Sequence, residues 1–96
     1  MRQPSDELVV TGALGTAWAD WDDGISAYIA GDYATARRIW LPLARAGDRR
    51  AQYNLGVIHA NGKGVPENYG EAVKWWIQAA EQGHSGAQFS LGSAYF

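Results

Sequence analysis

The sequence predicts an all-α fold: a right-handed α-α superhelix, or solenoid, of about two and a half helix-pair repeats. Its strongest support is internal self-similarity, because AQYNLG begins at Ala51 and AQFSLG begins at Ala87, 36 residues later. A repeat of this length is typical of stacked helix pairs, each of which buries its apolar face against its neighbours. The same offset joins further pairs of residues: Tyr33 with Tyr69, Trp40 with Trp76, and Gly47 with Gly83.

Five helices are expected, near residues 18–30, 33–46, 49–61, 69–82 and 85–96. The first two form a shortened unit over residues 18–47, because the turn between them is only Ala30-Gly31-Asp32. Residues 48–83 form the full repeat, and residues 84–96 form a third unit that is truncated after its first helix. The repeat domain therefore covers residues 18–96, and residues 1–17 are an N-terminal extension.

Helix ends are predicted from residues that cap helices. Gly47 and Gly83 each follow an apolar periodic segment and are expected to end their helices in the left-handed conformation. Asp48 and Ser85 come next and are expected to be the N-caps of the following helices.

Apolar spacing predicts how the helices pack. In the helix near residues 49–61, one stripe contains Ala51, Leu55 and Ile58, which are spaced for a single helix face. Gly56 is a poor helix former, and its missing side chain would let two helices approach closely. Trp40, Trp75 and Trp76 are assigned to packing between repeats, since they lie on second helices.

The stretch NGKGVPEN, residues 61–68, has a glycine pattern that could turn the chain or bind a phosphate. A phosphate loop requires a preceding strand, four residues between its glycines, and a hydroxyl group after the lysine. Gly56 and Gly62 enclose five residues, and Gly64 follows Lys63. The stretch is therefore predicted to be a connector between two helices.

Composition limits the classes of function. The net charge of −2 offers no general attraction for nucleic acid, and the 96 residues include no cysteine for a disulfide, a thiolate metal ligand or thiol catalysis. His59 and His84 alone do not make a metal site. No cofactor and no metal are expected.

The N-terminal segment leaves the compartment open. LVVTGALGTAWA is a modest apolar run that ends in Ala17-Trp18-Ala19, which has the form of a signal-peptidase site. Asp6 and Glu7 oppose this interpretation because a signal peptide requires a basic start. Both a cytoplasmic and an exported or periplasmic protein fit, and the run is too short to span a bilayer.

One full unit resembles a known family. The residues that carry the resemblance are Ala51, Leu55, Gly56, Gly62, Gly64, Val65, Ala72, Trp75, Ala79, Ala80 and Gly83. They are similar to the Sel-one-like repeat, a relative of the tetratricopeptide repeats. The resemblance implies an adaptor or scaffold that binds a protein or peptide on the concave groove formed by the first helix of each pair. It does not imply an enzyme.

Residues on the exposed stripe of each first helix are the candidate partner-binding residues. Trp21, Tyr53 and Phe89 occupy equivalent positions and would form an aromatic row. Trp21 is assigned to binding, whereas for Tyr53 both binding and packing between repeats remain open. The full candidate set is Trp21, Asp22, Ile25, Tyr28, Tyr53, Asn54, Val57, Asn61, Phe89 and Ser90.

Other assignments remain open beside the interaction module. The chain could be a fragment of a longer structural scaffold, because Leu91, Tyr95 and Phe96 leave the last helix apolar and uncapped. The same helix could support self-association. A secreted hydrolase acting on cell-wall or β-lactam substrates is a weaker alternative, because relatives with that activity resemble disulfide-rich chains. No nucleic-acid partner and no membrane insertion are expected.

Overall fold

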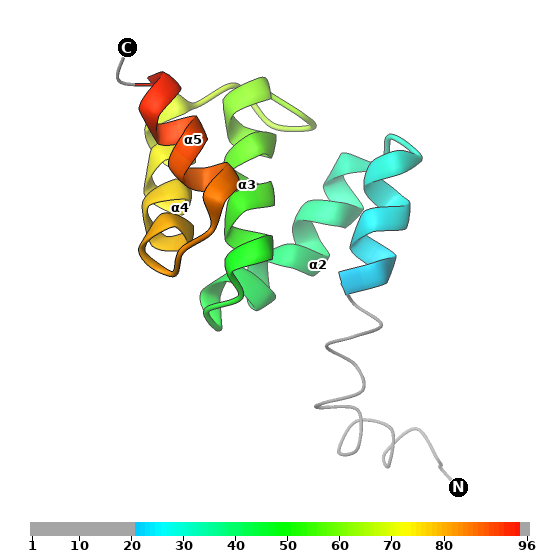
Figure 1. Ribbon diagram of the computed structural model, residues 1–96. Coiled ribbons are helices and arrows are strands. Elements are labelled where there is room, and N and C mark those ends of the chain that lie inside the picture. The colour runs from blue at the N-terminus through cyan, green and yellow to red at the C-terminus, as the bar shows by residue number, and fades with distance from the viewer. Residues whose placement is uncertain (1–20, 95–96) are drawn as a thin grey trace, which may run out of the picture.

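The structure is a computed structural model, and it describes residues 21–94. Its first helix covers residues 21–29. The labelled helices that follow are α2 (Tyr33–Arg45), α3 (Arg49–Asn61), α4 (Tyr69–Glu81) and α5 (Ser85–Ala94). Consecutive helices run antiparallel, and the described residues contain no strand (Figure 1). The all-α helical repeat is confirmed, whereas the right-handed superhelix stays a prediction. The signal-like segment of residues 1–17 lies outside the described residues.

Most of the predicted helix caps are correct. Gly47 and Gly83 have φ angles of 105° and 86°, in the left-handed region that favours glycine. The Asp48 carboxylate accepts hydrogen bonds from the backbone N–H groups of Arg50 and Ala51, as an N-cap does. The prediction for Ser85 is wrong, because Ser85 is already the first residue of α5.

His84 caps α5 in place of Ser85. The backbone N–H of Ala87 donates to His84 Nδ1 at 3.1 Å. This geometry requires an unprotonated Nδ1, so the imidazole provides the acceptor that a serine hydroxyl usually supplies.

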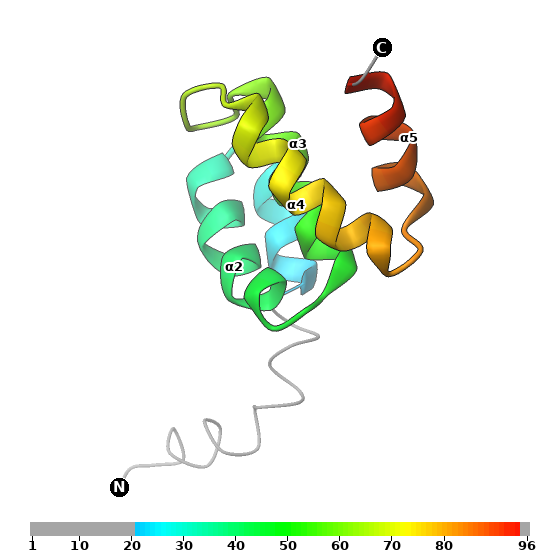
Figure 2. The same cartoon turned by 90° about the vertical axis from the view of Figure 1, so that its left-hand side faces the viewer.

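Two apolar clusters fill the spaces between successive helices. The first contains Ala51, Leu55 and Ile58, whose side chains are fully buried against α2, as the stripe predicted. The second surrounds Trp76 of α4 and extends to Ala87 of α5. Each cluster joins one helix pair to the next, so α2 and α5 lie on opposite sides of the α3–α4 pair (Figure 2).

A close contact between glycine and tryptophan occurs in both complete helix pairs. A Cβ atom on Gly56 would overlap the indole ring of Trp76, and a Cβ atom on Gly24 would overlap the ring of Trp40. The close approach expected at Gly56 is confirmed, and the ring that uses it belongs to Trp76. Glycine is required at both positions because the indole occupies the volume of a side chain.

Side-chain amide groups also connect the repeats. Gln52, which is 3% exposed, donates from Nε2 to the carbonyl oxygen of Ala44 at 3.0 Å. Its Oε1 accepts from Nε2 of Gln82 at 2.9 Å. Gln88 repeats the first bond one unit later, because its Nε2 donates to the Ala80 carbonyl at 3.2 Å. A first helix is therefore tied to the end of the preceding second helix at both junctions.

The connector at residues 62–68 is a turn after a helix. Gly62 and Gly64 have φ angles of 65° and 74°. The backbone N–H of Lys63 donates to the Ile58 carbonyl at 2.9 Å, and the Lys63 ammonium lies 5.1 Å from the centre of the Tyr33 ring. Val65 packs against the first apolar cluster. The turn closes the end of α3, and no strand precedes it as a phosphate loop would require.

Candidate partner-binding pocket

A pocket of about 290 Å³ opens between the helix of residues 21–29 and α3. Its walls are mainly apolar and aromatic, and polar groups come from one asparagine amide and two tyrosine hydroxyls. Such a lining, with few polar groups that fix orientation, is typical of binding sites. The lining residues are Ile25, Tyr28, Trp40, Tyr53, Asn54 and Val57.

Five of these six residues belong to the candidate set predicted from the sequence. The exception is Trp40, which was assigned to packing alone. Trp40 is 1% exposed, so it packs in the core and also forms the base of the pocket. Its indole Nε1 has no hydrogen-bond partner among the described residues.

Contacts between aromatic rings hold one wall of the pocket in place. The Tyr28 ring lies 5.8 Å from the Trp40 ring, centre to centre. Tyr28 also meets Tyr33 edge-on, with ring centres 5.2 Å apart. Both separations fall in the range of favourable aromatic pairs. The Tyr28 side chain is therefore held between rings from α2.

The opposite wall is fixed by contacts within its own repeat and with the next one. The Tyr53 ring stacks on the His84 ring, with centres 4.6 Å apart and planes 19° apart. The Tyr53 carbonyl accepts a hydrogen bond of 3.2 Å from Trp76 Nε1. Tyr53 thus packs between repeats and also lines the pocket, and its role in partner binding stays a prediction.

Trp21 lies beside the pocket and packs against the core. The centre of the Trp21 ring is 5.4 Å from that of the Trp40 ring. The guanidinium of Arg50, a residue of α3, lies 4.2 Å from the centre of the Trp21 ring. Trp21 therefore takes part in packing, and its assignment to partner binding stays a prediction.

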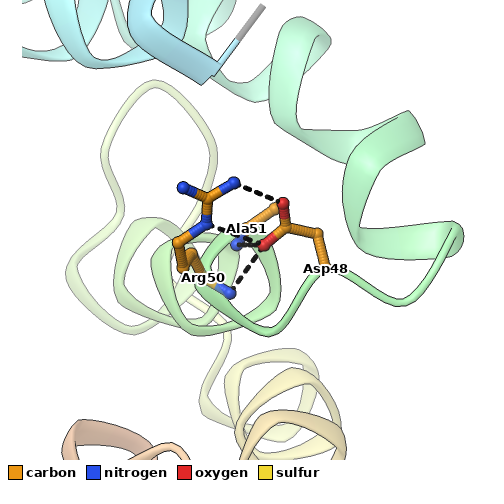
Figure 3. A network of polar contacts seen from close by, with 3 residues as sticks. All are labelled: Asp48, Arg50 and Ala51. Carbon is orange, nitrogen blue, oxygen red and sulfur yellow. Dashed lines mark hydrogen bonds and ion pairs between the residues drawn. The ribbon is translucent and has the colours of Figure 1, made fainter. Parts of the chain in front are cut away.

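The Arg50 guanidinium, which lies over the Trp21 ring, is held in place by Asp48. Figure 3 shows the contacts between Arg50 and Asp48. Arg50 Nη2 lies 2.9 Å from Asp48 Oδ2, and Arg50 Nε donates to Asp48 Oδ1 at 3.2 Å. Burial raises the pKa of Asp48, but the hydrogen bonds from Arg50 and from the Ala51 N–H outweigh burial and lower this pKa below its ordinary value. The carboxylate therefore stays charged and keeps the guanidinium in a cation-π geometry.

Besides Trp21, four candidates do not line the pocket. Asp22 and Asn61 are exposed at the two ends of the groove, and Ser90 is half-buried on α5. Phe89 is 77% exposed. Trp21, Tyr53 and Phe89 make no ring contact with one another in the described part of the chain, since Trp21 pairs with Trp40 and Tyr53 with His84. The aromatic row is thus three separate rings on successive first helices.

The geometry of α3, the glycine turn and α4 agrees with a comparison against protein families. Residues 49–84 match the model of the Sel1 repeat. The chain carries a Sel1 repeat. The match begins and ends one residue after the predicted unit of residues 48–83, and it identifies this unit as a helical repeat of a kind that typically mediates protein interactions. Among curated proteins, none matches the chain.

The Sel1 repeat contributes the second wall of the pocket, and the shortened unit before it contributes the first wall and the base. Each helix within residues 21–94 is too short or too polar to cross a membrane. The contribution of His84 to the Tyr53 wall was missed in the sequence. Its signal is its position directly after Gly83, which places it at the N-cap of the next helix.

Proposed function

We propose that this Sel1-repeat chain binds a segment of a partner protein in its concave groove, with one apolar side chain of the partner inserted into the pocket. The observation that carries the proposal is the pocket itself, which lies on the first helices and is lined by Tyr28, Tyr53 and Val57. Aromatic and aliphatic walls bury an apolar anchor, and such anchors supply most of the binding energy in interfaces.

The polar group placed for backbone recognition is Asn54. Its side chain carries a donor and an acceptor, which match the carbonyl and N–H groups of a peptide. Asn54 lies next to Tyr53 on the wall of the pocket. A peptide with its anchor inserted would therefore pass the Asn54 amide at the rim.

Preorganisation supports binding at this site. Tyr53 is stacked on His84, and its backbone carbonyl is bonded to Trp76. Tyr28 is held by Trp40 and by an edge contact with a second tyrosine. Side chains that are already ordered lose little entropy when a ligand binds. The flexible partner segment carries the remaining ordering cost, so we expect micromolar affinity, with Kd on the order of 1–100 μM.

The proposal includes no catalytic step. The six lining residues contain neither a carboxylate nor an imidazole that could act as a general acid or base.

The test uses a random peptide library displayed on phage, selected on the wild-type chain. Binding of each selected peptide is then measured by fluorescence anisotropy to two variants. Asn54→Trp places an indole at the pocket wall, whereas Gln78→Trp places the same ring at an exposed position on α4. Far-UV circular dichroism checks that both variants keep their helices.

We expect selected peptides to share an apolar anchor and to lose at least roughly tenfold in affinity for Asn54→Trp, a change of about 1.4 kcal/mol. Affinity for Gln78→Trp should match that of the wild type. Peptides that bind Asn54→Trp as tightly as the wild type would place the partner elsewhere on the chain.

A further inference from the structure

The N-cap before α3 and the N-cap before α5 are different types of residue. Asp48 and His84 occupy these positions, 36 residues apart. The Asp48 carboxylate accepts from the backbone N–H of Ala51 at 3.3 Å. His84 Nδ1 accepts from the backbone N–H of Ala87 at 3.1 Å. The same hydrogen bond is thus made at the start of both helices, but its acceptor is a carboxylate in one and an imidazole in the other.

The residue that follows each cap by two positions also differs. Arg50 of α3 lies over the Trp21 ring, whereas the counterpart of Arg50 in α5 is Gly86. A Cβ atom on Gly86 would lie 3.0 Å from Cε1 of His84 and 3.3 Å from Cε1 of Tyr53. The absence of a side chain at Gly86 therefore leaves room for the imidazole to stack on the Tyr53 ring, with ring centres 4.6 Å apart.

The cap bond and the ring contact make His84 a link between α5 and the pocket. Its Nδ1 is bonded to the first turn of α5, and its ring face lies on Tyr53, which lines the pocket. Protonation places a hydrogen on Nδ1, which then cannot accept from the Ala87 N–H. The added charge also lies at the N-terminus of α5, where the helix dipole disfavours a cation. Protonation therefore removes the bond that orients the imidazole against Tyr53.

We propose that His84 positions Tyr53 for partner binding and makes this binding depend on pH. The uncharged imidazole holds Tyr53 in the wall of the pocket, and the protonated imidazole leaves the cap and releases the Tyr53 ring. This inference rests on the proposed function, because the partner has to bind at the pocket for the order of Tyr53 to matter. A released side chain is ordered again when a partner segment binds, which corresponds to a loss of roughly two- to tenfold in affinity. Affinity therefore falls as the pH falls.

The cap of α3 does not share this response. Histidine ordinarily changes its charge between about pH 5 and pH 8, and the chain contains two histidines, His59 and His84. Burial raises the pKa of Asp48, but its hydrogen bonds outweigh burial and lower this pKa below its ordinary value. The carboxylate at the first cap therefore keeps its charge over that range. His59 does not line the pocket, so His84 is the histidine that contacts the pocket wall.

The other charged or titratable groups around His84 come from α3 and α4. Tyr53 and Arg49 belong to α3, and Arg49 Nη1 donates to the carbonyl of Gln82 at 2.8 Å. Glu81 is exposed at the end of α4, and α5 itself carries no charged side chain. Tyrosine and arginine ordinarily keep their charge between pH 5 and pH 8. The contribution of the Glu81 carboxylate is tested with the variant Glu81→Gln.

The first measurement needs no partner. The full chain with carbon-13-labelled tyrosine and histidine rings is studied by NMR between pH 8 and pH 5. We expect nuclear Overhauser contacts between the Tyr53 and His84 rings at pH 8, and their loss over the pH range in which the His84 signals titrate. The variants His59→Gln and Glu81→Gln should show the same loss. Circular dichroism checks that each protein keeps its helices at both ends of the range.

The second measurement uses a peptide selected on the wild-type chain. The peptide is acetylated and amidated at its ends and lacks histidine, aspartate and glutamate, so its own charge stays constant. By fluorescence anisotropy, the wild type, His59→Gln and Glu81→Gln should each bind it roughly two- to tenfold more weakly at pH 5 than at pH 8. His84→Asn should bind it equally at both pH values, because asparagine caps a helix without titrating.

Four results would overturn the inference. They are ring contacts that persist at pH 5, equal wild-type affinity at both pH values, pH dependence that remains in His84→Asn, and pH dependence that disappears in His59→Gln or Glu81→Gln. Failure of the proposed function gives a different result, because the peptide would then bind Asn54→Trp as tightly as the wild type. In that case the ring contacts still decide whether protonation of His84 releases Tyr53.

Discussion

The substitution Gly56→Ala tests whether the glycine–tryptophan contact determines the packing of α3 on α4. Alanine is a better helix former than glycine by about 1 kcal/mol, so helix propensity alone predicts stabilisation. The structure predicts the opposite, because the new Cβ would lie 2.8 Å from Cε2 of Trp76 and would overlap the indole nitrogen. The ring is buried and its Nε1 is bonded to the Tyr53 carbonyl, so it has little room to move.

The expected change in the free energy of unfolding of Gly56→Ala is the sum of three contributions. Overpacking costs about 2 kcal/mol, and the weakened indole hydrogen bond costs about 1 kcal/mol, against a gain of about 1 kcal/mol in helix propensity. The expected net loss is about 2 kcal/mol, or about 10 °C in Tm for a domain of this size.

The matched control is Gly92→Ala, where nothing lies within 4 Å of the new methyl group among the described residues. This variant should be as stable as the wild type or more stable by up to about 1 kcal/mol. Urea unfolding followed by circular dichroism measures both variants. Equal stability changes for Gly56→Ala and Gly92→Ala would refute the reasoning.

The remaining predictions concern Trp76, the glycine turn and one histidine. Trp76→Ala should cost about 3–5 kcal/mol because it empties the centre of the second cluster, and an unchanged urea midpoint would contradict this. Gly64→Val should lower the Tm because residue 64 has a φ of 74°, whereas Lys63→Ala should leave the Tm within a few degrees; thermal melts compare the two. Burial lowers the pKa of His59 in the folded chain. The unfolded chain therefore binds a proton at His59 more strongly than the folded chain does, so the free energy of unfolding decreases as the pH falls below the ordinary histidine range. His59→Gln should therefore lose less stability than the wild type between pH 7 and pH 5 in urea titrations, and identical losses would count against it.

Local chemistry made the helix ends predictable. Gly47 and Gly83 end helices because only glycine adopts their positive φ angles at low cost, and Asp48 begins one because its carboxylate accepts backbone N–H groups. The N-cap prediction was wrong for Ser85, which is already the first residue of α5. His84 holds the cap position, and its ring also stacks on Tyr53. Its position directly after Gly83 signals the cap, but the stacking depends on how the repeats pack, which local sequence does not show.

The groove was predictable to the level of the helix face but not of individual contacts. Periodicity placed Ile25, Tyr53 and Val57 on one side, and all three line the pocket. It could not indicate that Trp40 reaches through from α2 to form the base, because the depth of a ring depends on the neighbouring Gly24. Nor could it place Trp21 against the core, since that contact depends on helix separation.

The central claim is that the pocket on the first helices receives the partner, and methyl NMR tests it most directly. Ile25 and Val57 line the pocket, whereas Ile77 is exposed on α4 and serves as an internal reference. A peptide selected on the wild-type chain is titrated into protein with labelled isoleucine and valine methyl groups. Shifts of Ile25 and Val57 that saturate together, with Ile77 unchanged, are the expected result. Saturating shifts at Ile77 with Ile25 and Val57 unchanged would contradict the claim and move the binding surface to the second helices.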